Sequence, residues 1–255
     1  MELAGRIALV TGGATGIGRA TVLRLARAGV AGVAINYRTA RKEAEQVAAK
    51  VRQLGAEALC VHADVKRDKE VRQMVQVVGD RFGRLDVLVN NAGVTHWVPI
   101  TDLEALSDAM WDEIMDVNVK AAFRCTRAAR PLLSDAQGMV VNVSSISGIL
   151  ATATCSSLAY GAAKAALIYL TRGLAIALAP KVRVNAVAPA FTDTLWMRKH
   201  YGDEYDQMVA GAAPNFPLRR IATSEDVAEA IVSLVTGGDF VTGQTLIVDG
   251  GLSLS

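Results

Sequence analysis

The sequence predicts an α/β protein built on a doubly wound parallel sheet, and three observations support this prediction. Short apolar runs rich in valine and isoleucine recur with little polar alternation, as in strands buried on both faces of a parallel sheet. Stretches typical of helices separate these runs, which implies βαβ crossovers. A length of 255 residues with 51% apolar and 20% charged side chains suits one globular domain with a continuous core.

The expected elements alternate along the chain. The strands are predicted at 6–10, 33–35, 58–62, 87–89, 139–143, 182–187 and 245–248. The helices are predicted at 18–27, 41–54, 68–82, 103–133, 160–179 and 224–235. Ser224 is the expected N-cap of the last helix, because two acidic residues follow it. Residues 190–217 form the most irregular segment, and a long insertion late in such a sheet can cover a ligand.

Charge and composition exclude several classes of function. Lysine plus arginine is 27 and aspartate plus glutamate is 25, with no basic block and only 5% aromatics, so we expect no nucleic-acid partner. The N-terminus lacks the pattern of a signal peptide, and no apolar run approaches the roughly 18 residues of a spanning helix. Three cysteines without a CxxC motif predict free thiols and a cytoplasmic location. No histidine joins a carboxylate in a plausible metal motif, so no metal is expected.

A glycine-rich turn follows the first predicted strand. Residues 11–18 read TGGATGIG, and a helix begins there. Glycines permit a tight turn and a close backbone approach, and the helix N-terminus offers free N–H groups to a phosphate. The spacing is Gly-x-x-x-Gly-x-Gly rather than the common GxGxxG. A plain turn is the structural alternative, but the position between first strand and first helix favours nucleotide binding.

Five motifs, taken together, resemble those of the short-chain dehydrogenase/reductase family. They are TGxxxGxG at 11–18, Asn-Asn-Ala-Gly at 90–93, Asn118, the Ser-Ser pair at 144–145, and Tyr160 with Lys164 as YxxxK. They occur in the family's order and cover nearly the whole chain. The resemblance implies a single Rossmann-type domain over residues 1–255, commonly a homotetramer. It also implies hydride transfer between NAD(H) or NADP(H) and a carbonyl or alcohol substrate.

The resemblance assigns roles to four side chains. Tyr160 would donate or accept the proton, Lys164 would bind the nicotinamide ribose, Ser145 would hydrogen-bond the substrate oxygen, and Asn118 would hold a water that links Lys164 to solvent. Tyr160 and Lys164 are four residues apart, so they share one helix face. A nearby ammonium would lower the tyrosine pKa from its usual value of about 10.

The choice of serine depends on an insertion. Ser145 lies 15 residues before Tyr160, two more than is usual in the family, which indicates a two-residue insertion within 149–157. If the insertion precedes the site instead, Ser147 has the usual spacing. We favour Ser145 because it keeps its relation to the end of the strand.

The coenzyme is expected to be NADP, with NAD possible. The end of the second strand usually carries an acid that binds the adenosine ribose of NAD, but Asn36, Tyr37 and Arg38 stand there. A 2′-phosphate therefore meets no repulsion, and Arg38 with Thr39 could contact it. Thr15 stands where many NADP-specific relatives have a basic residue, which leaves NAD open.

Further cofactor contacts follow from the resemblance. Asp64 and Val65 resemble the pair that contacts adenine, and Ala190 follows Pro189 where the family usually has glycine, adding a methyl near the nicotinamide. The full expected set is Gly12, Thr15, Gly16, Ile17, Gly18, Asn36, Tyr37, Arg38, Asp64, Val65, Asn91, Ala92, Gly93, Tyr160, Lys164, Pro189, Thr192 and Thr194.

The substrate pocket is expected between His96 with Trp97, the loop 146–158 and residues 191–201. Trp97, Trp196 and Met197 suggest some apolar substrate surface, and the alternative is that they are ordinary core or interface residues. His96 is expected to be a pocket wall or surface residue rather than an acid. The chain resembles β-ketoacyl-carrier-protein reductases and sugar or polyol dehydrogenases about equally. The alternatives to an NADP-dependent reductase are therefore an NAD-preferring sugar or polyol dehydrogenase and a non-catalytic nucleotide-sensing protein.

Overall fold

Seven parallel strands form one sheet in the computed structural model, which describes residues 1–151 and 155–254. The strand order is β3-β2-β1-β4-β5-β6-β9, so the chain winds outward from β1 in one direction and then in the other. This confirms the predicted doubly wound sheet. The strands are β1 (Ile7–Val10), β2 (Gly32–Tyr37), β3 (Glu57–His62), β4 (Val87–Asn90), β5 (Met139–Val143), β6 (Arg183–Pro189) and β9 (Thr245–Val248).

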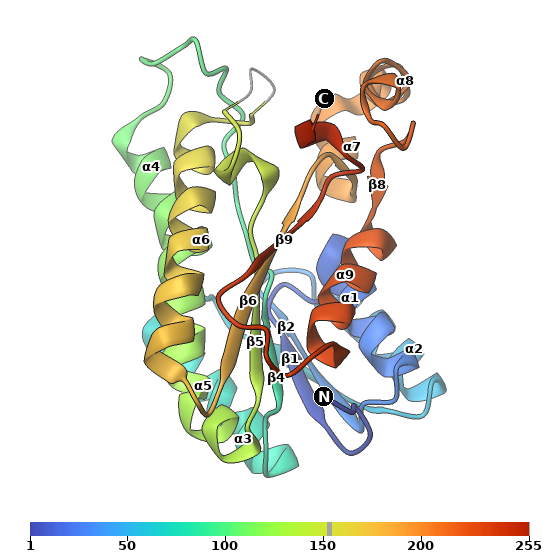
Figure 1. Cartoon of the computed structure of the whole chain (residues 1–255), viewed down its shortest axis with the longest axis vertical. Helices are drawn as coiled ribbons and strands as arrows, with labels where there is room; N and C mark the ends of the chain where they lie inside the picture. The colour runs from blue at the N-terminus through green and yellow to red at the C-terminus, as the bar shows by residue number, and fades with distance from the viewer. Residues whose placement is uncertain (152–154, 255) are drawn as a thin grey trace.

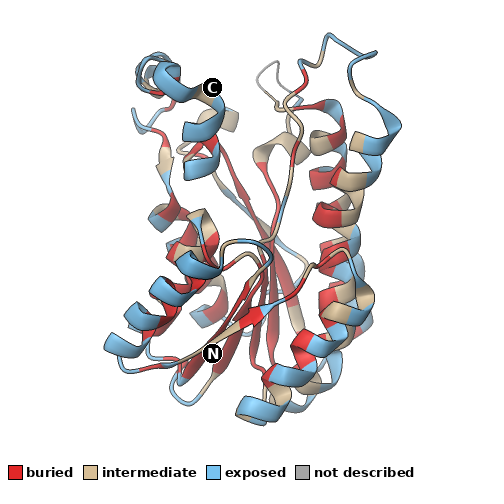
Figure 2. Cartoon of the chain, turned by 180° about the vertical axis from the view of Figure 1, so that it is seen from behind, coloured by how far each residue is buried: buried red, intermediate tan, exposed pale blue. Residues whose placement is uncertain are grey.

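Helices cover both faces of the sheet (Figure 1). On β1, Ala8 and Val10 pack into the core with α1, α2 and α9, whereas Ile7 and Leu9 pack into the core with α3, α5 and α6. The inner strands β1, β2, β4, β5 and β6 are buried between the two layers, whereas the edge strands β3 and β9 are more exposed (Figure 2). The helices are α1 (Gly16–Arg27), α2 (Arg41–Gln53), α3 (Asp68–Phe82), α4 (Asp108–Met115), α5 (Ala121–Ala136), α6 (Leu158–Leu178) and α9 (Ser224–Thr236).

The single helix predicted at 103–133 is wrong in two respects. It begins later, at Asp108, because Ser107 is its N-cap and accepts a hydrogen bond from Met110 N at 3.4 Å. It is also divided between α4 and α5 by a π-helical turn, η1 (Asp116–Lys120). Such turns are common at functional sites, and this one contains Asn118.

Residues 190–217 are not irregular, contrary to the prediction. They contain β7 (Thr192–Asp193), α7 (Leu195–Tyr201) and α8 (Tyr205–Ala212), with 3₁₀ turns η3 (Gly202–Glu204) and η4 (Ala213–Asn215). β7 pairs in parallel with β8 (Ala222–Thr223). These helices are too short for a clear apolar period, which is why the pattern gave no sign of them. We call residues 190–217 the covering segment.

The N-cap of α9 is Thr223 and not Ser224 as predicted. Thr223 Oγ1 accepts from Asp226 N at 3.1 Å, and Asp226 Oδ2 accepts from Thr223 N at 2.7 Å, which completes a capping box. Ser224 Oγ instead donates to Asp193 O at 3.1 Å and so ties the start of α9 to β7.

One helix, α6, is long and apolar enough to cross a membrane by length and composition, although the sequence analysis found no such run. Its contacts are with β6, α4 and α5. It carries the buried side chain of Lys164 on the face that meets the sheet. These contacts are those of a core helix.

Candidate active site

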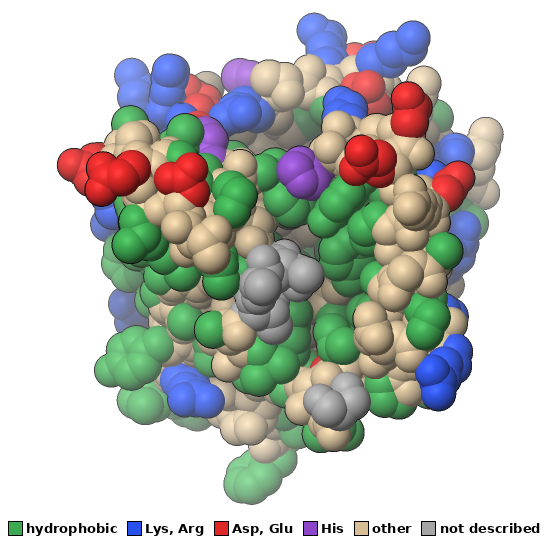
Figure 3. Space-filling model, turned by 90° about the horizontal axis from the view of Figure 1, so that it is seen from above, with side chains coloured by type: hydrophobic (Ala, Val, Ile, Leu, Met, Phe, Trp, Pro, Cys, Tyr) green, Lys and Arg blue, Asp and Glu red, His purple; other side chains and the backbone are tan. Residues whose placement is uncertain are grey.

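The predicted site residues gather at the carboxyl ends of the strands. In an open α/β sheet, ligands bind at this edge where the strand order reverses. Viewed from above, hydrophobic side chains gather around the middle of this face, and most charged side chains lie toward its rim (Figure 3).

The turn after β1 needs glycine for both conformation and space. Gly12 and Gly16 have φ values of +61° and +52°, which disfavour any other residue. A Cβ on Gly18 would lie 2.3 Å from Gly12 O and 2.5 Å from Asn91 Nδ2. The backbone of α1 therefore approaches the turn more closely than any side chain allows.

The N-terminus of α1 fits a phosphate. Thr15 is exposed at the N-cap position and makes no side-chain cap bond, and no acidic residue lies in the first turn. The helices α4, α6, α7 and α9 have capping side chains, whereas α2 and α3 share the uncapped start of α1 but have an acidic residue in the first turn. The first N–H groups of α1 are therefore free of side-chain caps among the described residues, as a dinucleotide pyrophosphate requires. Ile17 packs against the core beneath the turn.

Thr194 faces this turn from the covering segment. Its methyl Cγ2 lies 3.7 Å from the position of a Cβ on Gly16. Its hydroxyl accepts from Met197 N at 3.3 Å and caps α7. The glycine turn and the start of α7 thus lie side by side.

The Asn-Asn-Ala-Gly motif joins the ends of β1 and β4. Thr11 Oγ1 accepts from Asn91 N at 2.9 Å and from Ala92 N at 3.0 Å. Asn91 Nδ2 donates to Thr11 O at 2.9 Å. Thr11 is missing from the predicted set, although a threonine directly before the glycines was a visible signal. A Cβ on Gly93 would lie 3.0 Å from Asn118 Oδ1, so this glycine gives the asparagine access to the site.

Asn36 supports the turn from within. Its Oδ1 accepts from Gly12 N at 3.2 Å and its Nδ2 donates to Ala63 O at 3.1 Å, and only 2% of the residue is exposed. The side chains at the end of β2 that are open to a ligand are those of Tyr37, which is half-buried, and Arg38, which is exposed. Among the described residues, Arg38 has no ion-pair partner.

Asp64 and Val65 follow β3 as predicted, and their side chains have structural contacts. Asp64 Oδ1 accepts from Lys66 N at 2.9 Å, and Asp64 N donates to Glu70 Oε2 at 2.8 Å. Val65 is buried in the core. These contacts fix the loop before α3.

Pro189 and Ala190, at the end of β6, anchor the covering segment. Pro189 is the last residue of β6 and is paired with Val248. The Ala190 methyl packs with Phe216 in a small separate core. Thr192 is buried, and its Oγ1 donates to Ala190 O at 2.8 Å. The methyl that replaces the usual glycine hydrogen thus belongs to this core.

Helix α6 brings Tyr160 and Lys164 to the end of β5. The Oγ of Ser157 accepts from Tyr160 N at 3.2 Å and starts the helix. Lys164 Nζ lies 5.4 Å from the centroid of the Tyr160 ring and donates to Val143 O at 2.9 Å. Ser144 Oγ donates to Lys164 O at 2.8 Å, which fastens the strand end to the helix.

Ser145, rather than Ser147, meets the tyrosine. A side-chain hydrogen bond joins Ser145 to Tyr160. Ser147 N donates to Ser145 Oγ at 3.2 Å, so Ser147 supports its neighbour through the backbone. The predicted insertion at 149–157 lies in part outside the described residues, because 152–154 are not described.

Burial shifts the pKa values of both Tyr160 and Lys164. Burial raises the pKa of Tyr160, and the hydrogen bond with Ser145 only partly opposes this. Burial lowers the pKa of Lys164 to about 8. The expectation that the ammonium lowers the tyrosine pKa is therefore wrong for the coenzyme-free protein. Tyr160 is protonated at neutral pH, which suits a proton donor.

Asn118 presents an unpaired oxygen to the site. The π-helical turn orients its Nδ2 to donate to Val94 O at 2.8 Å and to Ile114 O at 2.9 Å. Its Oδ1 is buried and has no hydrogen-bond partner among the described residues. Buried acceptors of this kind are commonly satisfied by ordered water, which agrees with the role implied for Asn118.

Gly148 is a positioning residue that the sequence analysis missed. A Cβ there would lie 2.5 Å from the carbonyl carbon of Lys164. The 3₁₀ turn η2 (Ile146–Gly148) can lie directly against α6 only because this position is glycine. Its signal was the glycine three residues after Ser145.

His96 is half-buried and held to α4. Its Nε2 is 3.0 Å from Glu113 Oε2, and Lys66 Nζ is 3.2 Å from Glu113 Oε1. The bonds from Lys66 and then His96 hold the pKa of Glu113 below its usual value. No group of three metal-ligating side chains occurs within the described ranges 1–151 and 155–254.

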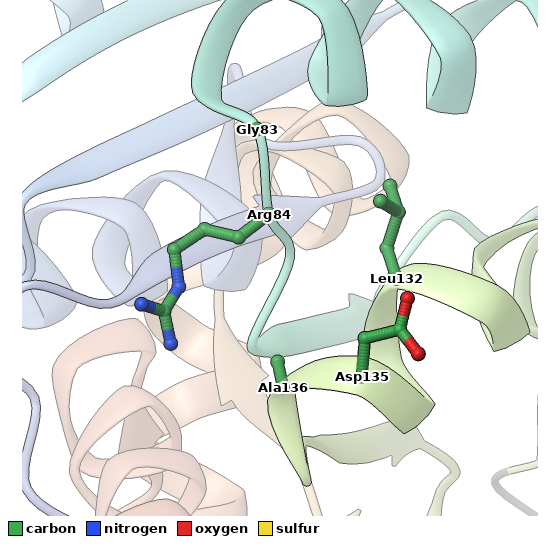
Figure 4. Close-up of a pocket in the computed structure, with 5 residues that line it drawn as sticks. All are labelled: Gly83, Arg84, Leu132, Asp135 and Ala136. Atoms are coloured by element: carbon green, nitrogen blue, oxygen red, sulfur yellow. The ribbon is translucent and has the colours of Figure 1, made fainter.

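Two surface hollows lie away from this site. One, of about 260 Å³, is lined by Gly83, Arg84, Leu132, Asp135 and Ala136 (Figure 4). The other, of about 450 Å³, lies between α3 and α5 and shares Leu132 with the first. Neither contains a predicted site residue. Gly83 and Arg84 precede β4, so the first hollow is at the amino ends of the strands.

The lowered pKa of Lys164 predicts a pH-dependent stability. The pKa is about 8 in the folded chain and 10.5 when unperturbed, so the unfolded chain binds more protons between these values, and stability rises with pH there. Relative to Lys164→Met, the parent should gain about 2 kcal/mol of unfolding free energy from pH 8 to pH 10. Denaturant titrations of both proteins measure this difference. A constant difference across the range would contradict the buried ammonium.

Comparisons with known proteins agree with this geometry. The profile of a family described as enoyl-(acyl carrier protein) reductase matches residues 12–253. The chain is 40% identical over 97% of its length to ketoacyl reductase 2 of the granaticin polyketide synthase of Streptomyces violaceoruber, covering 96% of that protein. It is 36% identical over 96% of its length to the 3-oxoacyl-[acyl-carrier-protein] reductase FabG of Staphylococcus epidermidis, covering 98% of it.

Solved structures show the same likeness. A crystal structure described as a short-chain dehydrogenase/reductase from Burkholderia xenovorans superposes with a TM-score of 0.91. It is 35% identical in sequence, and the match covers 98% of this chain and 99% of that one. The likeness extends over the whole sheet and the elements around the site.

Proposed function

Because the chain belongs to the short-chain dehydrogenase/reductase family of oxidoreductases, we propose that it is an NADPH-preferring carbonyl reductase. In this proposal the whole chain, residues 1–255, acts as one catalytic domain, and the covering segment closes over the substrate. The opposite reaction, oxidation of a secondary alcohol, uses the same groups in reverse.

One observation carries the proposal. Ser145, Tyr160 and Lys164 meet at the end of β5, on the same edge of the sheet as the uncapped N-terminus of α1. An uncapped helix start beside a glycine turn suits a dinucleotide, and a protonated phenol with a serine partner suits a carbonyl oxygen. A nucleotide sensor needs only the first of these two features.

Each of the four site residues has its own role in the proposed reduction. When bound, NADPH supplies the hydride that reduces the carbonyl carbon. Ser145 donates a hydrogen bond that orients the carbonyl oxygen, and Tyr160 gives that oxygen its phenol proton, which completes the alcohol. Lys164 holds the ribose and stabilises the phenolate that remains, since its ammonium lies on the same helix face. The free Oδ1 of Asn118 holds the water through which protons return.

The preference for NADPH rests on Arg38. Its exposed guanidinium stands at the end of β2, where no carboxylate repels a phosphate. We expect Arg38→Ala to raise the dissociation constant for NADPH about tenfold, the size of one charge-assisted hydrogen bond, and to leave that for NADH unchanged. Fluorescence titration measures both constants. Arg52→Ala, at the far end of α2, is the matched control, and an equal loss for both coenzymes would contradict the assignment.

The substrate class and the assembly follow from the relatives and the surface. Two relatives are named as ketoacyl reductases, so a β-keto thioester or ester is the first substrate to test. We propose a homotetramer, supported by the apolar Leu246 and Ile247 on the edge strand β9 and by Ile176 on α6, which is 82% exposed. The free thiols of the three cysteines favour the cytoplasm.

A coenzyme-linked screen tests the proposed function. Purified protein is assayed at 340 nm with NADPH and with NADH against β-keto esters, simple ketones and aldoses. We expect reduction of keto esters with NADPH. A preference for aldoses with NAD as acceptor would favour the sugar dehydrogenase, and coenzyme binding without any turnover would favour the nucleotide sensor.

A further inference from the structure

We propose that a cluster of aromatic side chains over Tyr160 selects ketones that carry an aromatic ring beside the carbonyl. The cluster consists of Trp97, Phe191, Trp196, His200 and Tyr201, and we call it the ring cluster. The inference rests on the proposed function, because it names the substrate class of the same site.

The ring cluster joins the loop after β4 to α7 and reaches the tyrosine. Trp97 belongs to the loop between β4 and α4, whereas Trp196 and His200 belong to α7. The rings of Trp97 and His200 are stacked, with centroids 3.7 Å apart and planes 7° apart. Trp97 and Trp196 are 5.9 Å apart, and Trp196 lies edge-on to the Tyr160 ring at 6.1 Å.

This concentration of rings is unusual for the chain. Aromatic residues make up only 5% of the sequence, yet two of the three tryptophans lie here, within reach of the proposed proton donor. Trp196 is 42% exposed despite its neighbours. A large apolar side chain that remains open to solvent at a reactive centre marks a surface for a ligand.

Trp97 and Trp196 lie outside the small core that anchors the covering segment, whereas Phe191 packs against that core. This core consists of Ala190, Phe216 and Ile221. The β7–β8 pairing and the bond from Ser224 Oγ to Asp193 O add to this anchor. The exposed part of the Trp196 ring is therefore available for recognition.

The arrangement suits a planar aromatic ring better than a saturated chain. Aromatic pairs prefer offset or edge-on contacts with centroids about 4.5–7 Å apart, and they gain free energy beyond that of area burial. Trp196 already lies at such a distance from Tyr160, so a ring attached to the reacting carbonyl would extend the same set of contacts. A saturated ring of equal size would gain only the burial of its surface.

The test uses two ketones that differ only in aromaticity. Ethyl benzoylacetate and ethyl 3-cyclohexyl-3-oxopropanoate have the same β-keto ester and rings of similar size. The parent, Trp196→Leu and Trp196→Phe are assayed with NADPH, and Trp111→Leu is the matched control because Trp111 lies on α4 outside the ring cluster. Calorimetric titration of each ketone into each protein with NADP⁺ gives the dissociation constant of the ketone without turnover.

We expect the parent to favour the benzoyl ester in kcat/KM. Trp196→Leu should reduce this preference about 3- to 10-fold, mainly through a higher KM for the benzoyl ester. Trp196→Phe should restore much of the preference, and Trp111→Leu should not change it. An unchanged preference in Trp196→Leu, or a parent that favours the cyclohexyl ester, overturns the inference.

The proposed function can fail separately. If the parent reduces no carbonyl compound of the coenzyme-linked screen with either coenzyme, the reductase proposal fails, and the titrations then decide the inference. Tighter binding of the benzoyl ester that is lost in Trp196→Leu supports ring selection, and equal binding of the two esters overturns it.

Discussion

Replacing Tyr160 by phenylalanine is expected to lower kcat by about 10²- to 10⁴-fold, the usual contribution of a general acid. The ring, its contact with Trp196 and the helix cap at Ser157 all remain, because none of them uses the hydroxyl. The bond with Ser145 and the transferable proton are lost. Steady-state reduction of a keto ester with NADPH measures the fall, and coenzyme titration should give an unchanged dissociation constant.

Tyr169 provides a matched control on the same helix. It is 77% exposed and lies well along α6 from Tyr160, so Tyr169→Phe should keep the parent kcat. A Tyr160→Phe protein that keeps most of its activity would remove Tyr160 from the proton transfer. A loss of coenzyme binding would instead indicate that the substitution disturbs the fold around Lys164.

Gly18→Ala is the second change with a large expected effect, and it acts on coenzyme binding. Its Cβ would overlap Gly12 O at 2.3 Å and Asn91 Nδ2 at 2.5 Å, so α1 or the turn must move. We expect the unfolding free energy to fall by about 1–3 kcal/mol from overpacking. The dissociation constant for NADPH should rise at least about tenfold, because the moved backbone no longer presents its N–H groups to the phosphates.

Gly211→Ala is the control for this substitution. Gly211 lies within α8, and a Cβ there meets nothing within 4 Å. Alanine in a helix should stabilise the protein by up to about 1 kcal/mol and leave coenzyme affinity unchanged. Thermal unfolding and fluorescence titration report both quantities. Equal coenzyme affinity in Gly18→Ala and the parent would show that the turn does not contact the phosphates.

The elements predicted best are those whose pattern is local. The strand at 139–143 and the helix at 68–82 have the predicted bounds, because a strand buried on both faces leaves a continuous apolar run and an amphipathic helix leaves a repeat of apolar residues. The helix predicted at 103–133 was wrong because a π-helical turn leaves no periodic sign. The prediction that the covering segment is irregular was wrong for a related reason, since α7 and α8 have only seven and eight residues.

The site residues also divide into those that a local pattern identifies and those that only a tertiary contact identifies. The motif that contains Gly12, Gly16 and Gly18 could be identified from the chain alone, because positive φ and close backbone approach both require glycine. Gly148 could not be assigned, since its need for glycine arises from contact with Lys164, distant in sequence. The choice between Ser145 and Ser147 likewise depends on which hydroxyl meets Tyr160 where η2 packs against α6.

The sequence by itself determined the order of strands and helices, the glycine turn and the pairing of Tyr160 with Lys164 on one helix face. These features depend on period and spacing within a few residues. The tertiary structure alone decided that Asn36 faces inward, that burial raises the pKa of Tyr160, and that Trp97 meets Trp196 and His200. Each of these arises between segments far apart in the chain, where burial and contact depend on how the whole sheet packs.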